Sequence, residues 1–256
     1  MIRVLHKACD VLELLAARPE QPAGLGEIAG KLGLNASTCA NILKTLIARG
    51  LVEQVGPRKG YRLGGTVYFL ARGGPYRRDL VEIARPLVAG LSAELGEMAL
   101  LATLQHGKRF ILCIVNPARA VQVRDDVPYL NDVYETATGR LLLAHETPGE
   151  VDAYVAEHGP PGPAWPGAET PGALRTGLAR IRDEGECVVT DGPEVAQAAF
   201  PVFEDGRVIA AIGVGVPLLR FDDEHRGRIL VAGRAAAERL GDELTRATER
   251  QASPVG

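Results

Sequence analysis

Hydroxyl, amide and cationic side chains, with no Asp or Glu among them, gather on one face of the helix predicted to follow Asn35. They are Ser37, Thr38, Asn41, Lys44, Thr45 and Arg49. Hydroxyls and cations bond phosphate oxygens, Asn can pair with both polar atoms of an adenine edge, and Lys can reach a guanine or a phosphate. The opposite face is an apolar stripe at helical spacing, made of Cys39, Ile42, Leu43, Leu46 and Ile47. The pattern predicts a helix that packs through one face and contacts DNA through the other.

The neighbouring elements are those that would position such a helix. A short helix over 25–32 precedes it, Gly33 suits the left-handed position that closes that helix, and Asn35 is a good N-cap for the next. Two strands, 51–55 and 61–63, then flank a turn that carries Arg58 and Lys59 at its tip. We interpret the segment as a winged helix-turn-helix whose wing tip lies beside the minor groove. The alternative is an ordinary solvated helix beside a hairpin, with Thr45 and Arg49 meeting only water.

Charge divides the chain in the same place. The net charge of −3 combines a basic N-terminal part with an acidic remainder. Residues 1–75 hold ten Lys and Arg against five Asp and Glu, whereas residues 76–256 hold 19 against 27. A basic module joined to an acidic one is typical of a polyanion-binding protein with a separate sensor or assembly domain.

Composition excludes several other classes of protein. The 256 residues suffice for one large or two ordinary domains, and no apolar run approaches the ~20 residues of a membrane helix. The N-terminus lacks a signal-peptide core. The four cysteines lie far apart, and the histidines lack metal-ligand spacing. We therefore expect a cytoplasmic protein with buried thiols and with neither a metal nor a cofactor.

The rest of the chain predicts an α+β fold. We expect a helix over 3–17, a linker helix over 66–72, a break at 73–75 and a long helix ending at Gly96. A hairpin follows, with strands 98–105 and 110–115 joined by residues 106–109, then a possible strand at 120–124. Helices are predicted over 136–145, from Thr147 and from Thr170, and a second hairpin over 195–203 and 208–216. Asp222 caps a last helix, and the chain frays from Arg246.

These elements give four segments. We expect a DNA-binding domain over 1–65, a linker over 66–76, a ligand-binding and oligomerisation domain over 77–247, and a polar tail over 248–256. Residues 159–172 contain five prolines and four glycines, which predicts a loop or a flap. Trp165 within it is either an anchor of that loop or part of a lid.

The ordered set of motifs resembles the IclR family of bacterial transcriptional regulators over nearly the whole length. In the N-terminal part the resemblance rests on 25–29, 35–47, 49–52 and 61–64. In the C-terminal part it rests on 84–86, 134–140, 181–185, 199–203 and 216–217. The family resemblance implies a winged-helix domain and a GAF-like effector-binding domain built on an antiparallel sheet. It also implies a homodimer or homotetramer that acts on promoter DNA as a repressor or an activator, under the control of a small organic acid or aromatic catabolite.

The resemblance also implies where the effector pocket lies. Carried over onto this chain, it falls near Ala137, Thr138, Asp191, Gln197, Gly213 and Gly215. The chain departs from the family pattern in three places. Tyr134 or Glu135 stands in place of a histidine, Arg140 in place of a lysine, and the two glycines in place of serines.

The glycines support two interpretations. Loss of two hydroxyls and their bulk favours a larger, partly apolar ligand such as an aromatic compound, whereas close packing of the backbone is the alternative. A carboxylate can rest on the free N–H groups near Thr138. A second functional interpretation, a small-molecule enzyme whose winged segment docks a protein, finds no nucleophile–base set to support it.

Overall fold

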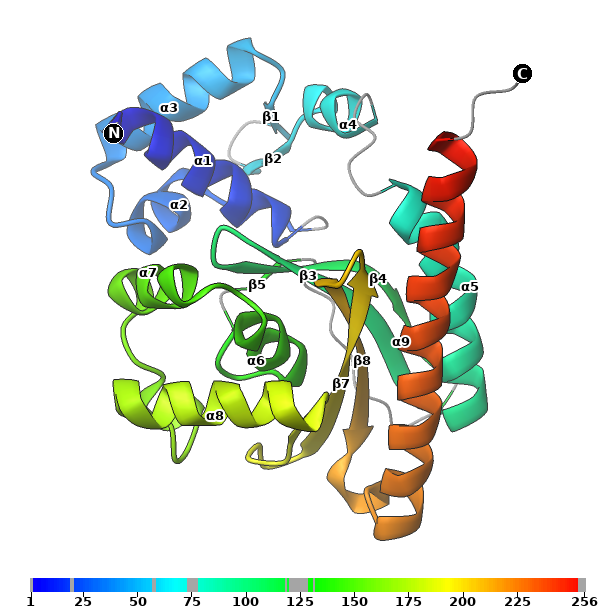
Figure 1. The fold of residues 1–256 in the computed structure, drawn as a ribbon. Helices are drawn as coiled ribbons and strands as arrows, with labels where there is room; N and C mark the ends of the chain where they lie inside the picture. Colours follow the sequence, from blue (N-terminus) through cyan, green and yellow to red (C-terminus); the bar gives the residue numbers. More distant parts are fainter. Residues whose placement is uncertain are drawn as a thin grey trace. The chain divides into compact units, whose positions relative to one another are not determined.

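The computed structural model describes residues 2–18, 21–56, 59–72, 78–117, 119, 129–130 and 132–252 (Figure 1). The chain forms two compact units, Met1–Tyr76 and Arg77–Gly256. Within the described residues, no helix has the length and hydrophobicity needed to cross a membrane.

The N-terminal unit is a winged helix-turn-helix, as predicted. It contains α1 (Arg3–Ala16), α2 (Leu25–Lys31), α3 (Ala36–Ala48), the strands β1 (Val52–Gln54) and β2 (Tyr61–Leu63), and α4 (Gly65–Arg72). The strands pair antiparallel, with Val52 opposite Leu63. Residues of three helices and β1 fill its core, among them Val11, Ile28, Leu43 and Val52. This core fixes α3 through its apolar face and leaves the other face outward.

The C-terminal unit is a six-stranded antiparallel sheet with helices on both faces (Figure 1). The strand order is β5-β4-β3-β8-β7-β6. The strands are β3 (Met98–Gln105), β4 (Lys108–Val115), β5 (Tyr129–Leu130), β6 (Cys187–Val189), β7 (Val195–Glu204) and β8 (Arg207–Pro217). The antiparallel sheet and its covering helices agree with the predicted α+β class.

Two layers of helices cover the sheet. The helices α5 (Arg78–Leu95) and α9 (Asp223–Ala252) pack side by side on one face. The other face carries α6 (Ala137–Ala144), α7 (Pro148–His158) and α8 (Pro171–Glu184). Alternation along β3 sends Leu100 to the core beside α6 and Leu101 to the core beside α5. The sheet therefore separates two cores, and the short helix α6 lies directly over one of its faces.

Four details differ from the sequence prediction. The first hairpin turns at His106 and Gly107 alone, so Lys108 and Arg109 belong to β4. The Pro/Gly-rich segment is an ordered connection with a short 3-10 helix, η1 (Gly162–Ala164), and a buried Trp165, so the tryptophan is an anchor. The strands β5 and β6 were not predicted, and residues 120–124 lie outside the described residues.

The fourth difference concerns the C-terminus. The sequence predicts a chain that frays from Arg246, whereas α9 continues to Ala252. Ion pairs one turn apart, Arg239 with Glu243 and Arg246 with Asp242, support its last turns.

Candidate DNA-binding face and effector pocket

The polar face of α3 is exposed, as a DNA-contacting face must be. Ser37, Asn41, Lys44, Thr45 and Arg49 are exposed and Thr38 is half-buried, while Cys39, Ile42, Leu43 and Leu46 are buried. Ile47, predicted in the apolar stripe, is 38% exposed. Successive residues of a helix are rotated by about 100° around its axis, and this rotation places Ile47 at the edge of the stripe, where the core no longer covers it.

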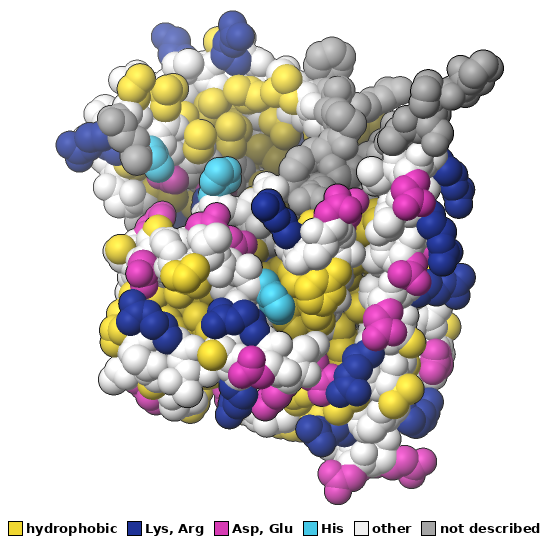
Figure 2. Space-filling view, viewed as in Figure 1, with side chains coloured by type: hydrophobic (Ala, Val, Ile, Leu, Met, Phe, Trp, Pro, Cys, Tyr) yellow, Lys and Arg dark blue, Asp and Glu magenta, His cyan; other side chains and the backbone are white. Residues whose placement is uncertain are grey.

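The predicted face divides into a centre and one flank. Ser37, Asn41 and Lys44 lie within about 60° of one another around the helix axis. Thr38 and Thr45 lie toward α1 and, together with Asn41, line a groove of about 380 Å³. Its apolar wall comes from Val4, Leu5, Ala8, Ile42 and Leu46. Figure 2 shows hydrophobic side chains gathered on the visible face of this unit, with Lys and Arg side chains beside them.

Local hydrogen bonds occupy several of the hydroxyl and N–H donors. The Asn35 side chain accepts from the Thr38 N–H at 2.7 Å and from the Ser37 hydroxyl at 2.9 Å. The Thr45 hydroxyl donates to the Asn41 carbonyl at 2.9 Å. The Asn41 side chain and the lysine are therefore better placed than the hydroxyls to donate to a base or a phosphate.

Three of the predicted cations have no acidic partner within the part of the chain that the structure describes: Lys44, Arg49 and Lys59. By contrast, Arg62 pairs with Glu53 at 2.5 Å, and Arg18 and Lys31 both pair with Glu27. The wing residue Arg58 lies outside the described residues. The unpaired cations thus lie on α3, at its end and on the wing, where they face solvent.

A cavity of about 250 Å³ lies between the sheet and the N-terminus of α6. Two rows of residues opposite one another in the sheet form its floor. One row runs Gln197–Gly215–Met98, and the other runs from Gly213 to Leu100. Residues directly opposite in antiparallel strands point to the same face. Of the predicted pocket residues, Ala137, Thr138, Gln197, Gly213 and Gly215 all line this cavity.

The first turn of α6 forms the roof. Thr136 is its N-cap and accepts from the Gly139 N–H at 3.2 Å. The Gln197 side-chain oxygen accepts from the Ala137 N–H at 3.1 Å. Two of the N–H groups that a helix start leaves without an intrahelical partner are thus used by the protein itself. Fewer backbone N–H groups near Thr138 are therefore free to bind a ligand than the sequence predicts.

A buried ion pair that the sequence analysis missed forms one wall. Arg109 is 1% exposed and holds Asp132 through Nε and Nη2, at 2.8 and 2.5 Å. Its Nη1 lies 3.5 Å from the Thr138 hydroxyl. This bidentate ion pair places a cation and an anion together at the cavity, so the wall is polar but has no net charge.

Asp191 does not line this cavity. Its carboxylate pairs with the Arg140 guanidinium at 2.7 Å, away from the cavity lining. Arg140 also donates to the carbonyls of Tyr134 and Ala164, and its guanidinium lies over the Trp165 ring at 4.6 Å. Arg140 therefore connects α6 to the segments that contain Tyr134 and Ala164, and the Asp191 carboxylate binds the same guanidinium.

The two glycines of the floor have different surroundings. A Cβ at Gly213 would lie 2.7 Å from Thr138 Cγ2 and 3.1 Å from Leu100 Cδ1. The glycine thus allows the close approach of α6 to the sheet, which is the packing interpretation. Gly215 lies between Gln197 and Met98 on the cavity floor.

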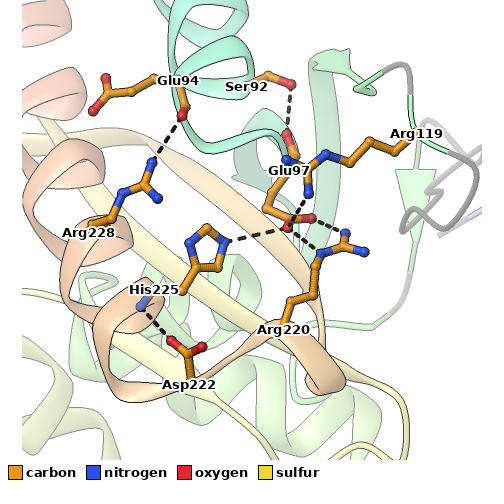
Figure 3. Close-up of polar contacts among 8 residues, drawn as sticks. All are labelled: Ser92, Glu94, Glu97, Arg119, Arg220, Asp222, His225 and Arg228. Atoms are coloured by element: carbon orange, nitrogen blue, oxygen red, sulfur yellow. Dashed lines mark hydrogen bonds and ion pairs between the residues drawn. The ribbon is translucent and has the colours of Figure 1, made fainter.

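A second buried charge cluster lies at the junction of α5, β3 and α9 (Figure 3). The Glu97 carboxylate is 1% exposed and accepts from Arg220 Nε and Nη2 at 2.7 and 2.6 Å. Arg119 lies 3.7 Å and His225 Nε2 3.5 Å from the same carboxylate. This hydrogen bonding holds the pKa of Arg220 above its usual value. One carboxylate thereby joins three separate parts of the sequence, around Glu97, Arg119 and residues 220–225.

The buried thiols do not suit nucleophilic chemistry. Burial raises the pKa of the Cys187 thiol to about 12 and raises the pKa of the Cys113 thiol as well. A thiol that stays protonated at neutral pH is a poor nucleophile. Both residues belong to the packed cores.

Two family models match the chain. The model for the C-terminal region of the bacterial transcriptional regulator IclR matches residues 76–241, and that for the IclR helix-turn-helix domain matches residues 4–56. The regulator BhcR of Paracoccus denitrificans is 29% identical over 87% of this chain and 80% of its own length. The regulator Rv1719 of Mycobacterium tuberculosis is 30% identical over 86% and 84%.

Solved structures agree with these matches. An IclR-type regulator from Silicibacter sp. TM1040 superposes with a TM-score of 0.79 at 27% identity, covering 94% of this chain and 96% of its own. An IclR homologue from Microbacterium hydrocarbonoxydans, complexed with 4-hydroxybenzoate, has a TM-score of 0.72 at 24% identity, over 94% and 99%. The curated relatives are named as transcriptional regulators and not as enzymes. With a helix-turn-helix unit and an effector unit both matched, the chain belongs to the IclR family of bacterial transcriptional regulators.

Proposed function

We propose that this regulator reads its operator through Asn41 and Lys44 of α3, with Lys59 of the wing bound to phosphate. The observation that carries the proposal is the two-sided burial of α3: its apolar face is in the core, while Asn41 and Lys44 are exposed. Lys44 and Lys59 have no carboxylate partner among the described residues, so their charge is available to DNA. A homodimer or homotetramer would place two such helices on half-sites about 10 bp, or a multiple of it, apart.

Replacing Asn41 with Ala is expected to weaken operator binding by about 1–3 kcal/mol and to relax the choice of base at one position. Replacing Lys59 with Ala should weaken binding to all sequences alike and reduce the slope of log affinity against log salt by about 1. Gel shifts with the upstream DNA at several salt concentrations measure both effects. Arg62→Ala is the matched control, because Arg62 is an exposed wing cation already paired with Glu53. Unchanged affinity in both variants would refute this choice of DNA-binding face.

For the effector we propose a small organic carboxylate with a single ring or a short chain, bound in the cavity beneath α6. The cavity of about 250 Å³ lies below the range of roughly 300–1,000 Å³ that suits drug-sized ligands. Its apolar lining includes Met98, Leu100 and Val195, and its polar groups lie at one end, around Thr138. The complex of the M. hydrocarbonoxydans homologue with 4-hydroxybenzoate is consistent with a ligand of this size.

Calorimetry with small keto acids and aromatic acids tests this ligand class. We expect benzoate-like acids to bind and to change operator affinity in the gel shift. The physical reason is the apolar part of the lining, Met98, Leu100 and Val195, against which burial of a ring is favourable by about 25 cal/mol per Å². Tight binding of glyoxylate or pyruvate without any binding of aromatic acids would reject the aromatic preference. Binding of neither kind would reject the cavity as an effector pocket.

A further inference from the structure

The Gln197 side chain occupies the position at the start of α6 where the carboxylate of a ligand would bind. Its oxygen accepts the Ala137 N–H at 3.1 Å, and both residues line the cavity. An N–H group needs an acceptor, so the side-chain oxygen, and not its NH₂ group, faces the helix. A carboxylate seeking the same N–H meets an acceptor already in place.

The backbone of Gln197 is held on both sides, whereas its side chain has room to move. Gln197 pairs with Val189 of β6 on one side and with Gly215 of β8 on the other. Cross-strand neighbours on one face lie about 5 Å apart, and a glycine there presents no side chain. Because Gly215 lines the cavity next to Gln197, a rotation about the Gln197 side-chain bonds moves the amide across Gly215 without disturbing the sheet.

A carboxylate and a neutral amide differ in how strongly they bind this position. Hydrogen bonds to an ionised acceptor are roughly twice as strong as those between neutral groups. The positive end of the helix adds a further preference for an anion. A ligand carboxylate can therefore displace the Gln197 oxygen, whereas a neutral ligand amide, equal in strength to the group it replaces, cannot.

We propose that Gln197 is an internal competitor of the effector: it caps α6 in the ligand-free protein and yields the Ala137 N–H only to a carboxylate. This inference rests on the proposed effector pocket and deepens it, because it assigns the ligand an ionised carboxyl group. Gln197 then lowers the apparent affinity for every ligand, and it does so most for uncharged ones. The hydrogen bond between Gln197 and the Ala137 N–H thus selects for ionised ligands, and Gln197 itself does not bind the ligand.

Gln197→Ala distinguishes these roles. Removal of the competitor is expected to tighten binding of benzoate or pyruvate, whichever binds the wild type, by about 2- to 12-fold, the equivalent of one hydrogen bond. It should also allow the matched amides, benzamide or pyruvamide, to bind. If Gln197 instead holds the ligand directly, the same variant binds the acid more weakly. Calorimetry on the full chain measures both affinities.

Gln197→Glu and Gln105→Ala complete the experiment. A carboxylate fixed at position 197 should cap α6 permanently, raise the melting temperature of the ligand-free protein and weaken benzoate binding at least tenfold. Gln105 lies at the end of β3, outside the cavity lining, so its variant should match the wild type. Unchanged or weaker acid binding by Gln197→Ala would overturn the inference alone. Absence of acid binding in both the wild type and Gln197→Ala would overturn the effector pocket and this inference together.

Discussion

Replacing Glu97 with Ala is expected to lower the free energy of unfolding of the C-terminal unit by about 3–5 kcal/mol. The Glu97 carboxylate is buried and accepts two hydrogen bonds from Arg220, and Arg119 and His225 face it as well (Figure 3). Without it, the half-buried Arg220 guanidinium loses the carboxylate that accepts its two hydrogen bonds. Removal of one member of a buried ion pair costs far more than the net stabilisation that the pair provides, because the other charge remains desolvated.

The measurement is urea unfolding of the full chain followed by the fluorescence of Trp165. This residue is the sole tryptophan of the sequence and is 4% exposed in the core beside α6, so its signal reports on the C-terminal unit. Glu94→Ala is the control, since Glu94 is exposed on the same stretch of chain and should change stability by less than about 0.5 kcal/mol. A Glu97 variant as stable as the Glu94 variant would show that the cluster does not support the fold.

The DNA-binding unit was predictable because its signals are local. The cap at Asn35 and the period of the α3 stripe are properties of neighbouring residues, and the structure reproduces the order of the elements of this unit. The wrong assignment of Ile47 to the buried stripe also comes from relying on a local signal. Periodicity places a residue on an angle around the helix, but the extent of the core that covers that angle depends on α1 and α2.

The pocket was predictable only in part because it depends on strand register. Ala137 and Thr138 were expected in the pocket from the family resemblance, and both line the cavity, in the first turn of a helix whose N-cap is Thr136. Arg109 was placed in a loop. The turn in fact occupies His106 and Gly107, both with positive φ, of 48° and 72°, as two-residue hairpins require. A turn placed at these two residues would have put Arg109 in a strand otherwise rich in apolar residues, where a cation needs a partner.

Ion pairs between residues far apart in the sequence could not be predicted from local sequence patterns. Asp191 was assigned to the pocket, whereas the structure pairs it with Arg140, 51 residues earlier in the chain. Glu97 and Arg220 are separated by 123 residues. Both pairs depend on which elements become neighbours in the folded unit. The spacing of residues in the nearby sequence does not predict those neighbours.

Replacing Gly139 with Ala is expected to destabilise the C-terminal unit by about 3 kcal/mol and to abolish ligand binding in the cavity. A Cβ at this position would lie 2.4 Å from the Val133 carbonyl oxygen and 2.6 Å from Val133 Cα. These atoms belong to a backbone segment that is itself buried, so they cannot turn aside as a flexible side chain would. Overpacking of this kind costs about 1–3 kcal/mol, and the backbone clash places Gly139 at the upper end of that range.

The functional loss follows from the position of Gly139 in the first turn of α6. Its N–H donates to the Thr136 hydroxyl of the N-cap, and a shift of this turn away from Val133 would displace Ala137 and Thr138 from their positions in the cavity lining. Urea unfolding by Trp165 fluorescence measures the stability and calorimetry with benzoate the binding. Gly149→Ala is the matched control: it lies in the first turn of α7, a Cβ there meets no described atom within 4 Å, and alanine should stabilise the helix by up to about 1 kcal/mol. If Gly139→Ala unfolds at the same urea concentration as Gly149→Ala, then α6 can move without cost, and the close contact between its first turn and Val133 does not set the shape of the pocket.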